Sequence, residues 1–187
     1  YGGGVTFFSM KGQLEAILSG LRLPKATFTA VKDNPSFHPG RCAAISMNGE
    51  LLGYMGQVHP LVAKTYGLDT EVYCVELDFS KAFPMILPEP TFTPLPKYPA
   101  VTRDLSLLCD EAVTIAELEE VITAAGGKLL RRVDLFDIYR GKGVEDGKKS
   151  VAFNLVLRAD DRSLTAEEAD ADVKSILETL AADCGAI

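Results

Sequence analysis

The side chains best suited to acid–base or metal chemistry in this sequence are two histidines, each followed directly by a proline. His38 precedes Pro39 and His59 precedes Pro60, and these are the only histidines in 187 residues. Histidine is widely used in proteins for proton transfer and as a metal ligand. Neither histidine has an acidic partner at a metal-ligand spacing, and no serine or cysteine lies in a recognisable nucleophile motif. The pattern therefore predicts turns, with no catalytic and no metal-binding residues.

The four cysteines are widely spaced and form no Cys-x-x-Cys motif, which argues against a zinc knuckle or a redox site. Cysteines at this density are typical of buried, reduced thiols in a cytoplasmic protein. No apolar run approaches the roughly 20 residues that span a bilayer. The first residues lack the features of a signal peptide. They also lack a starting methionine, so we expect a fragment or a processed chain.

The formal net charge of −7 does not by itself favour a nucleic-acid partner. The distribution of charge along the chain is more informative than the net charge. Residues 91–187 hold 12 basic and 18 acidic side chains. The basic residues fall at expected strand ends and loops, and the acidic ones collect on two expected helices. This segregation predicts a positive face that could contact phosphates. The alternative is a set of solvated loops around a sheet.

A proline-rich strip divides the chain. Residues 84–99 contain six prolines, which fix the backbone in an extended form and remove hydrogen-bond donors. The strip is typical of a semi-rigid linker. We therefore expect two domains, residues 1–90 and 91–187.

Turn residues divide the first domain into short antiparallel elements. Asn48-Gly49 lies between two apolar runs and predicts a type I′ hairpin turn. A short helix is expected next, with His59 as its N-cap, Pro60 at its first position and Gly67 just past its end. Residues 71–79 predict a strand. An apolar stripe at helical spacing predicts a helix near the start: Leu14, Ile17, Leu18 and Leu21.

The second domain has the order strand, helix, strand, strand, helix, strand, which predicts a ferredoxin-like βαββαβ fold. The helices begin at two capping boxes, Thr114 with Glu117 and Thr165 with Glu168. The expected strands cover residues 103–109, 129–141, 149–158 and, cut short, 184–187.

The strand at 149–158 alternates strictly, so Val151, Phe153, Leu155 and Leu157 are expected on one buried face. Because Phe153 belongs to this core set, the sequence does not favour an RNA-recognition module that stacks bases on its third strand. The fold still leaves one face of the sheet uncovered, and such faces often bind a partner.

Several segments resemble a known family. KYPAVTRDLSLL, VDLFDIYRGKGVEDGKKSVAFNLVLRADDRSLT and the closing CGAI resemble the ferredoxin-fold anticodon-binding domain of bacterial phenylalanyl-tRNA synthetase β chains. The mitochondrial single-chain enzyme carries a similar domain. FFSMKGQLEAIL, HPGRCAAI and GYMGQVHP resemble the class II synthetase-like core module that precedes this domain in the bacterial β chain. The resemblance implies an α+β fragment from the C-terminal end of such a chain, with a partial antiparallel synthetase-like module before the βαββαβ domain.

The family's reaction is the ATP-dependent attachment of phenylalanine to its tRNA, with Mg²⁺. The resemblance implies a heterotetramer of two α and two β subunits in the cytoplasm, with the active site in the α subunit. The fragment itself would be inactive and hold no cofactor. Consistent with this, Gln57 and His59 stand where a working class II strand is expected to present an arginine to phosphate. The implied partners are the α subunit and tRNA(Phe), with no membrane and no DNA.

The resemblance assigns the second domain to the anticodon stem-loop. Asp137 is expected to accept a hydrogen bond from a base amino group, and Tyr139 to stack on a base. Phe136 is expected in the core and Gly141 at a turn, while Arg103 and Asp104 are either contacts or a stabilising pair. The basic residues expected near the tRNA are Lys97, Arg103, Arg140, Lys142, Lys148 and Lys149.

Three hypotheses follow. The first is a non-catalytic part of the ligase that binds tRNA and contacts the α subunit. The second is a pure subunit-interaction module without RNA contact, whose exposed apolar surface would dominate its behaviour. The third is an autonomous enzyme that uses His38 and His59.

Overall fold

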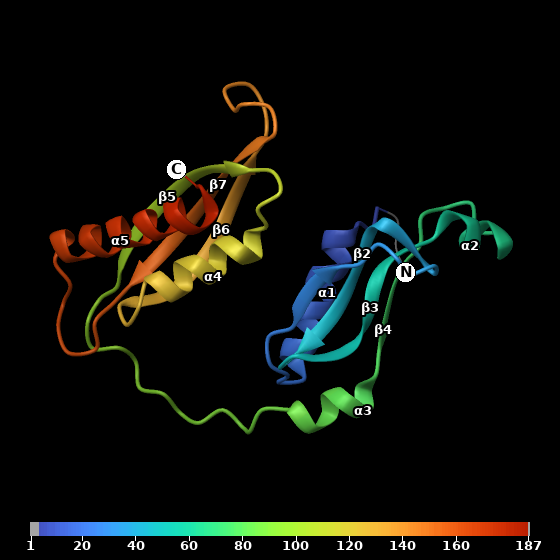
Figure 1. The fold of residues 1–187 in the computed structure, drawn as a ribbon. Coiled ribbons are helices and arrows are strands. Elements are labelled where there is room, and N and C mark those ends of the chain that lie inside the picture. The colour runs from blue at the N-terminus through green and yellow to red at the C-terminus, as the bar shows by residue number, and fades with distance from the viewer. Residues whose placement is uncertain (1–3, 187) are drawn as a thin grey trace. The chain divides into compact units, whose positions relative to one another are not determined.

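The computed structural model describes residues 4–186. They form two compact units that divide between Phe92 and Thr93, close to the boundary expected at residue 90. Within each unit the strands pair in antiparallel fashion, as expected (Figure 1). No helix in the described part combines the length and the apolar character needed to cross a membrane.

The first unit is a four-stranded antiparallel sheet with one long helix packed against it. The sheet order is β1-β2-β3-β4, so strands that follow each other in sequence are neighbours in space. The elements are α1 (Phe7–Gly20), β1 (Thr27–Ala30), β2 (Phe37–Met47), β3 (Glu50–Val58), α2 (Pro60–Thr65), β4 (Tyr73–Leu77), α3 (Phe79–Ala82) and the 3₁₀ helix η1 (Phe83–Met85).

Helix α1 buries a narrower stripe than its sequence predicts. Leu14 and Leu18 are buried against the sheet, but Ile17 is 59% exposed and Leu21 is 40% exposed. The expected helix is confirmed, and the sheet covers only two of the four residues in its apolar stripe. Periodicity places side chains on one side of a helix, but only the packed neighbours decide which of them are covered.

The turns of the first unit agree with the sequence. Asn48 and Gly49 have φ values of 51° and 81°, as a type I′ turn requires. His59 caps α2, because its Nδ1 accepts the backbone N–H of Leu61 at 3.2 Å. The Nδ1 atom of His38 likewise accepts the N–H of Gly40 at 3.0 Å. Both histidines close local turns.

The second unit is a three-stranded antiparallel sheet with two helices on one face (Figure 1). Its strand order is β5-β7-β6, the order of the first three strands of a ferredoxin-like fold, which confirms that prediction. The elements are β5 (Val101–Asp110), α4 (Ile115–Ala125), β6 (Leu130–Tyr139), β7 (Lys148–Leu157) and α5 (Ala166–Cys184).

The strand expected at residues 184–187 is not formed by residues 184–186. Cys184 is the last residue of α5, and Gly185 closes the helix with a φ of 60°. Ile187 lies outside the described residues.

The core of the second unit forms around the central strand β7. Val151, Phe153, Leu155 and Leu157 of this strand are all fully buried, as the alternation predicts. They pack with apolar side chains of β5 and of both helices. Both helices begin at the predicted capping boxes, Thr114 with Glu117 and Thr165 with Glu168.

Thr165→Ala is expected to lower the free energy of unfolding of the second unit by about 1 kcal/mol, because its hydroxyl caps α5. Urea denaturation followed by far-UV circular dichroism measures this loss. Thr179→Ala on the same helix is the matched control, since that hydroxyl only donates to the carbonyl of Ser175 one turn earlier. Equal losses in the two variants would contradict the capping role.

Candidate nucleic-acid interface

The second unit has one sheet face that its helices do not cover. Side chains of β7 alternate, so when the odd-numbered ones enter the core the even-numbered ones point the other way. Residues directly opposite on paired antiparallel strands share a face, so the register extends this surface across the sheet. We call it the open face. Its rows, read from β5 through β7 to β6, include Thr102–Val156–Arg132, Asp104–Asn154–Asp134, Ser106–Ala152–Asp137 and Leu108–Ser150–Tyr139.

The centre of the open face is polar and acidic. Asn154 Nδ2 donates to Asp104 Oδ1 at 2.8 Å, which leaves the other oxygens of this pair free for a ligand. On the next strand Asp134 Oδ2 accepts from Arg132 Nε at 2.6 Å. Three aspartates, one of them paired with Arg132, make the centre of this face acidic, whereas the sequence predicted basic residues at strand ends and loops. Such a centre suits groups that donate hydrogen bonds, including the amino groups of bases.

Tyr139 stands at one end of the open face beside a glycine. Its ring is 47% exposed, and its hydroxyl donates to the Lys142 carbonyl at 3.3 Å. A Cβ atom on Gly141 would lie 2.8 Å from the Tyr139 hydroxyl oxygen, so the glycine leaves room for the ring. Gly141 begins a turn, as expected, because its carbonyl accepts the N–H of Val144 at 3.0 Å, and the positive φ values of this loop belong to Gly143 and Gly147.

Most of the basic residues expected at the interface are already paired within the protein. Arg103 Nε lies 2.8 Å from Asp170 of α5, and the register places Arg103 opposite the buried Leu155. Arg103 therefore belongs to the helix-covered side and not to the open face, and its contact with tRNA stays a prediction. Lys148 pairs with Glu145 at 3.1 Å, within the β6–β7 loop region.

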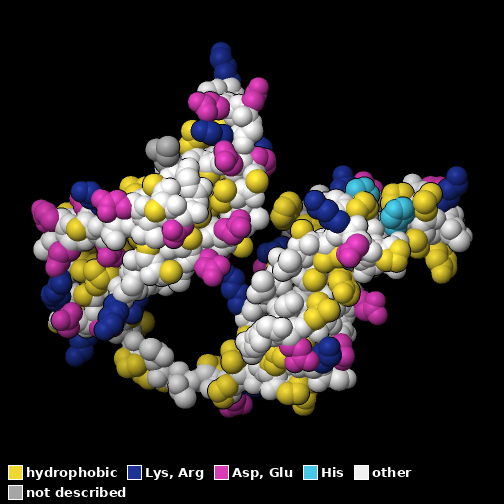
Figure 2. Space-filling model, viewed as in Figure 1, with side chains coloured by type: hydrophobic (Ala, Val, Ile, Leu, Met, Phe, Trp, Pro, Cys, Tyr) yellow, Lys and Arg dark blue, Asp and Glu magenta, His cyan; other side chains and the backbone are white. Residues whose placement is uncertain are grey.

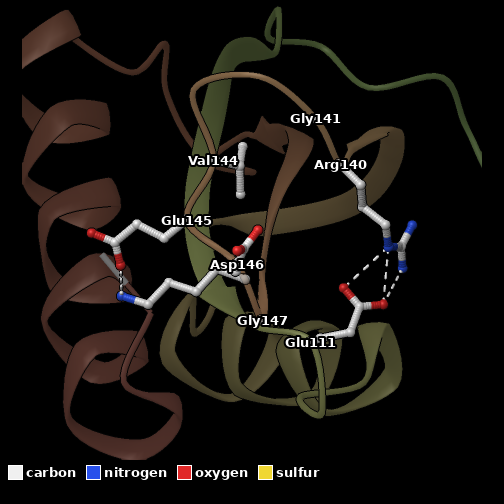
Figure 3. A pocket seen from close by; sticks show the side chains of 8 residues that line it. Glu111, Arg140, Gly141, Val144, Glu145, Asp146 and Gly147 are labelled. Atoms are coloured by element: carbon white, nitrogen blue, oxygen red, sulfur yellow. Dashed lines mark hydrogen bonds and ion pairs between the residues drawn. The ribbon is translucent and has the colours of Figure 1, made fainter.

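Arg140 follows Tyr139 and pairs with Glu111, just after the end of β5 (Figure 3). Arg140 Nη2 and Nε donate to Glu111 Oε1 at 2.7 and 2.9 Å, and Nε also lies 3.1 Å from Oε2. The hydrogen bonds from Arg140 hold the pKa of the Glu111 carboxyl below its ordinary value. The pair borders an open hollow of about 320 Å³ beside the β6–β7 loop.

Lys149 is buried and is not available to a phosphate, which corrects the prediction. Only 5% of its surface is exposed. Its Nζ donates to the backbone carbonyls of Glu111 and Val113, in the turn that leads from β5 to α4. Lys149 therefore ties the central strand to the start of the first helix.

Two predicted contacts remain exposed and have no acidic partner among residues 4–186. Lys97 lies in the proline-rich strip, and Lys142 lies in the β6–β7 loop. On the face seen in Figure 2, basic and acidic side chains are interspersed and no broad basic area appears. Together with the internal ion pairs, this arrangement favours a few separate phosphate contacts over a continuous basic surface.

Sequence reasoning missed Glu111, Asn154 and Asp134. The alternation of β7 was used to find the core, and the same alternation identifies Asn154 as a residue of the opposite face. Glu111 gives no local signal, because its partner Arg140 lies 29 positions away. Asp134 could be placed only once the register of β6 against β7 was known.

The first unit holds a polar cluster around Arg41 but no metal-ligand set. Arg41 Nη1 donates to Gln57 Oε1 at 2.7 Å and to Glu71 Oε1 at 2.9 Å. Tyr73 donates to the other oxygen of Glu71. Within the described residues, no three His, Cys, Asp or Glu side chains gather as potential metal ligands. Desolvation raises the pKa of every cysteine thiol, so these groups are poor nucleophiles.

Two family models match the chain, one in each unit. The second unit matches the ferredoxin-fold anticodon binding domain over residues 96–187. The first matches the phenylalanyl tRNA synthetase beta chain CLM domain over residues 2–79. These are the two modules that the sequence motifs resemble.

Relatives match across both units. The chain is 43% identical over 176 residues to the phenylalanine–tRNA ligase beta subunit of Bacillus licheniformis, covering 94% of this chain and 22% of the relative. It is 38% identical over 184 residues to that of Clostridium tetani, covering 98% and 23%. The Bacillus subtilis subunit is 41% identical over 176 residues, with 94% and 22% covered. The chain thus spans about a fifth of the length of these relatives.

Lys149→Met is expected to lower the free energy of unfolding by about 1–3 kcal/mol, because two carbonyls lose a charged donor in a buried position. Lys148→Met is the matched control, since it removes only a partly exposed ion pair and should cost less than about 1 kcal/mol. Urea denaturation of both variants measures the difference. A Lys149→Met variant as stable as the control would show that Lys149 does not anchor the turn.

Proposed function

The chain belongs to the phenylalanine–tRNA ligase β-subunit family, and on that premise we propose that its second unit binds the anticodon region of tRNA(Phe). The observation that carries the proposal is the open face, where an exposed tyrosine stands next to hydrogen-bonding groups. Tyr139, Ser150, Asp137 and Asn154 lie on this one surface. Proteins that recognise RNA sequence commonly stack unpaired bases of loops on aromatic rings and bind their edges by hydrogen bonds.

The charges of the open face favour contact with bases at its centre. A phosphate would be repelled by Asp104, Asp134 and Asp137, whereas a base amino group would be attracted. Phosphates would instead lie at the margin, near Lys142 and Arg140. The two kinds of contact then have different roles. Residues at the margin orient the RNA backbone, and residues at the centre recognise the bases.

The first unit supports a second role, as a surface for another protein. Phe8 and Ile17 of α1 are 79% and 59% exposed. Leu61 and Tyr66, at the two ends of α2, are 70% and 77% exposed. Exposed apolar surface of this kind is typical of interaction sites. We propose that these helices contact the ligase α subunit, in an assembly of two α and two β subunits.

The proposal gives the chain no catalytic step. ATP-dependent attachment of phenylalanine, with Mg²⁺, is assigned to the α subunit of a cytoplasmic holoenzyme. In the first unit, Arg41 Nη1 donates to the Glu71 carboxylate and to Gln57. Gln57 and His59 stand where a working class II strand is expected to present an arginine to phosphate.

The alternative, a pure interaction module without RNA contact, is favoured by the internal ion pairs. Arg103, Lys148 and Arg140 all have acidic partners in the second unit. Measured tRNA binding distinguishes the two functions, since the alternative predicts none for the chain alone or with the α subunit.

Tyr139→Ala is expected to weaken tRNA(Phe) binding by about 1–3 kcal/mol, roughly 5- to 150-fold, because a base loses its stacking partner. Tyr139→Phe should retain most of the affinity, since it keeps the ring and removes only the hydrogen bond to the Lys142 carbonyl. Filter binding or fluorescence anisotropy measures both. Tyr66→Ala, an equally drastic change to an exposed tyrosine of the first unit, is the control. Unchanged affinity in Tyr139→Ala would remove the open face from the RNA site.

Phe8→Ser combined with Ile17→Ser is expected to weaken association with a ligase α subunit at least tenfold, because two apolar anchors are lost from α1. Sedimentation velocity of a mixture of the two proteins measures this association. The same measurement on the chain alone reports any self-association. Leu61→Ser with Tyr66→Ser maps the contribution of α2 in the same way. If neither double variant changes association, the exposed apolar surface is not the docking site.

A further inference from the structure

The Glu111–Arg140 pair differs from the other ion pairs described in the second unit. Arg140 offers two nitrogens to Glu111 and forms three contacts of 2.7–3.1 Å. Arg103, Lys148 and Arg131 each show a single ion-pair contact. Both members of the Glu111–Arg140 pair remain about half exposed, with side-chain values of 48% and 54%. The Nε–Nη2 edge of the guanidinium is therefore engaged by Glu111 and yet accessible to a ligand.

From this geometry we infer that the Glu111 carboxylate occupies the position of an RNA phosphate at Arg140, and that bound RNA displaces it. The inference rests on the proposed function of the second unit. It identifies Glu111 as an intramolecular competitor. Glu111 weakens phosphate binding at Arg140 and makes this binding selective. Neither the sequence motifs nor the family matches assign a role to Glu111.

The chemistry of the exchange is direct. A guanidinium presents a planar fork of N–H groups that matches two oxygens of a carboxylate or two oxygens of a phosphate. A phosphate oxygen pair can therefore replace Glu111 Oε1 and Oε2 without any change in the arginine's geometry. Because the pair is half exposed, breaking it costs little compared with a buried pair.

The backbone around Glu111 does not depend on the ion pair. The Glu111 N–H donates to the Gly147 carbonyl at 2.8 Å. The Glu111 carbonyl accepts from the buried Lys149 at 3.1 Å. These bonds stay in place when the side chain swings away, so the exchange moves one side chain and leaves the turn intact. Since Arg140 holds the pKa of Glu111 below its ordinary value, Glu111 stays ionised at neutral pH and proton uptake does not drive the exchange.

The surroundings explain why an anchored phosphate is required. The hollow beside the pair is lined by three carboxylates, Glu111, Glu145 and Asp146, against two cations, Arg140 and Lys148 (Figure 3). A free anion gains little in such a hollow. Gly141 lines this hollow together with Arg140 and lies beside the Tyr139 hydroxyl, however, so an RNA whose base rests on Tyr139 brings its backbone close to Arg140. The linkage makes the local phosphate concentration high only for RNA that is already bound on the open face.

The test is a double-mutant cycle measured as tRNA(Phe) affinity of the whole chain. Glu111→Gln leaves one acceptor oxygen and no charge, and is expected to tighten binding about two- to fivefold, the equivalent of one exposed ion pair. Asp146→Asn removes the same charge from the same hollow but breaks no ion pair among the described residues, so it should give a smaller gain. In an Arg140→Gln background, Glu111→Gln should give no more than the Asp146→Asn gain. Glu111→Ala repeats the measurement with no acceptor at all.

Equal gains for Glu111→Gln and Asp146→Asn, or a Glu111→Gln gain that persists without Arg140, would overturn the inference. A second readout separates it from the proposed function. Titration with inorganic phosphate, followed by the ¹⁵Nε signal of Arg140, should shift that signal in Glu111→Gln at lower phosphate than in the unmodified chain. If this shift appears while no variant binds tRNA, the competitor role stands and the proposed function fails. If no shift appears although tRNA binds, the inference fails alone.

Discussion

The second unit depends on the packing of its central strand. Strand β7 lies between β5 and β6, and its apolar side chains from Val151 to Leu157 are fully buried beneath α4 and α5. Because side chains alternate along a strand, burying one set fixes the direction of the other. Ser150, Ala152 and Asn154 therefore point away from the helices. The binding surface is thus a geometric consequence of the core, and a change in the register of β7 would exchange the two sets.

The charge arrangement shows how an acidic unit can serve an anionic partner. Its arginines mostly have carboxylate partners within the protein, and the centre of the open face carries aspartates. Affinity based on a broad basic surface would be insensitive to sequence. In the proposed function, phosphate contacts are few and require the exchange of internal partners, so base contacts would carry a larger share of the recognition. This balance favours discrimination between RNAs over tight binding to any RNA.

The first unit keeps a well-packed antiparallel sheet while its polar side chains bind each other. Arg41 is held by Gln57 and Glu71, and both histidines accept backbone N–H groups in turns. The exposed apolar side chains of α1 and α2 point to a different use of the module, as a surface that another subunit covers.

The sequence alone determined the features that rest on neighbouring residues. The Asn48-Gly49 turn, the cap at His59, both capping boxes and the alternation of β7 follow from local hydrogen bonds and from periodicity. The family motifs, being contiguous, were also readable. Only the tertiary structure decided which charged groups are free. Arg103 meets Asp170 across 67 positions, Arg140 meets Glu111 across 29, and Lys149 is buried beneath a turn 36 positions before it. A charge that already has a partner in the protein can meet a ligand only by exchanging that partner, and such partners are brought together by the fold.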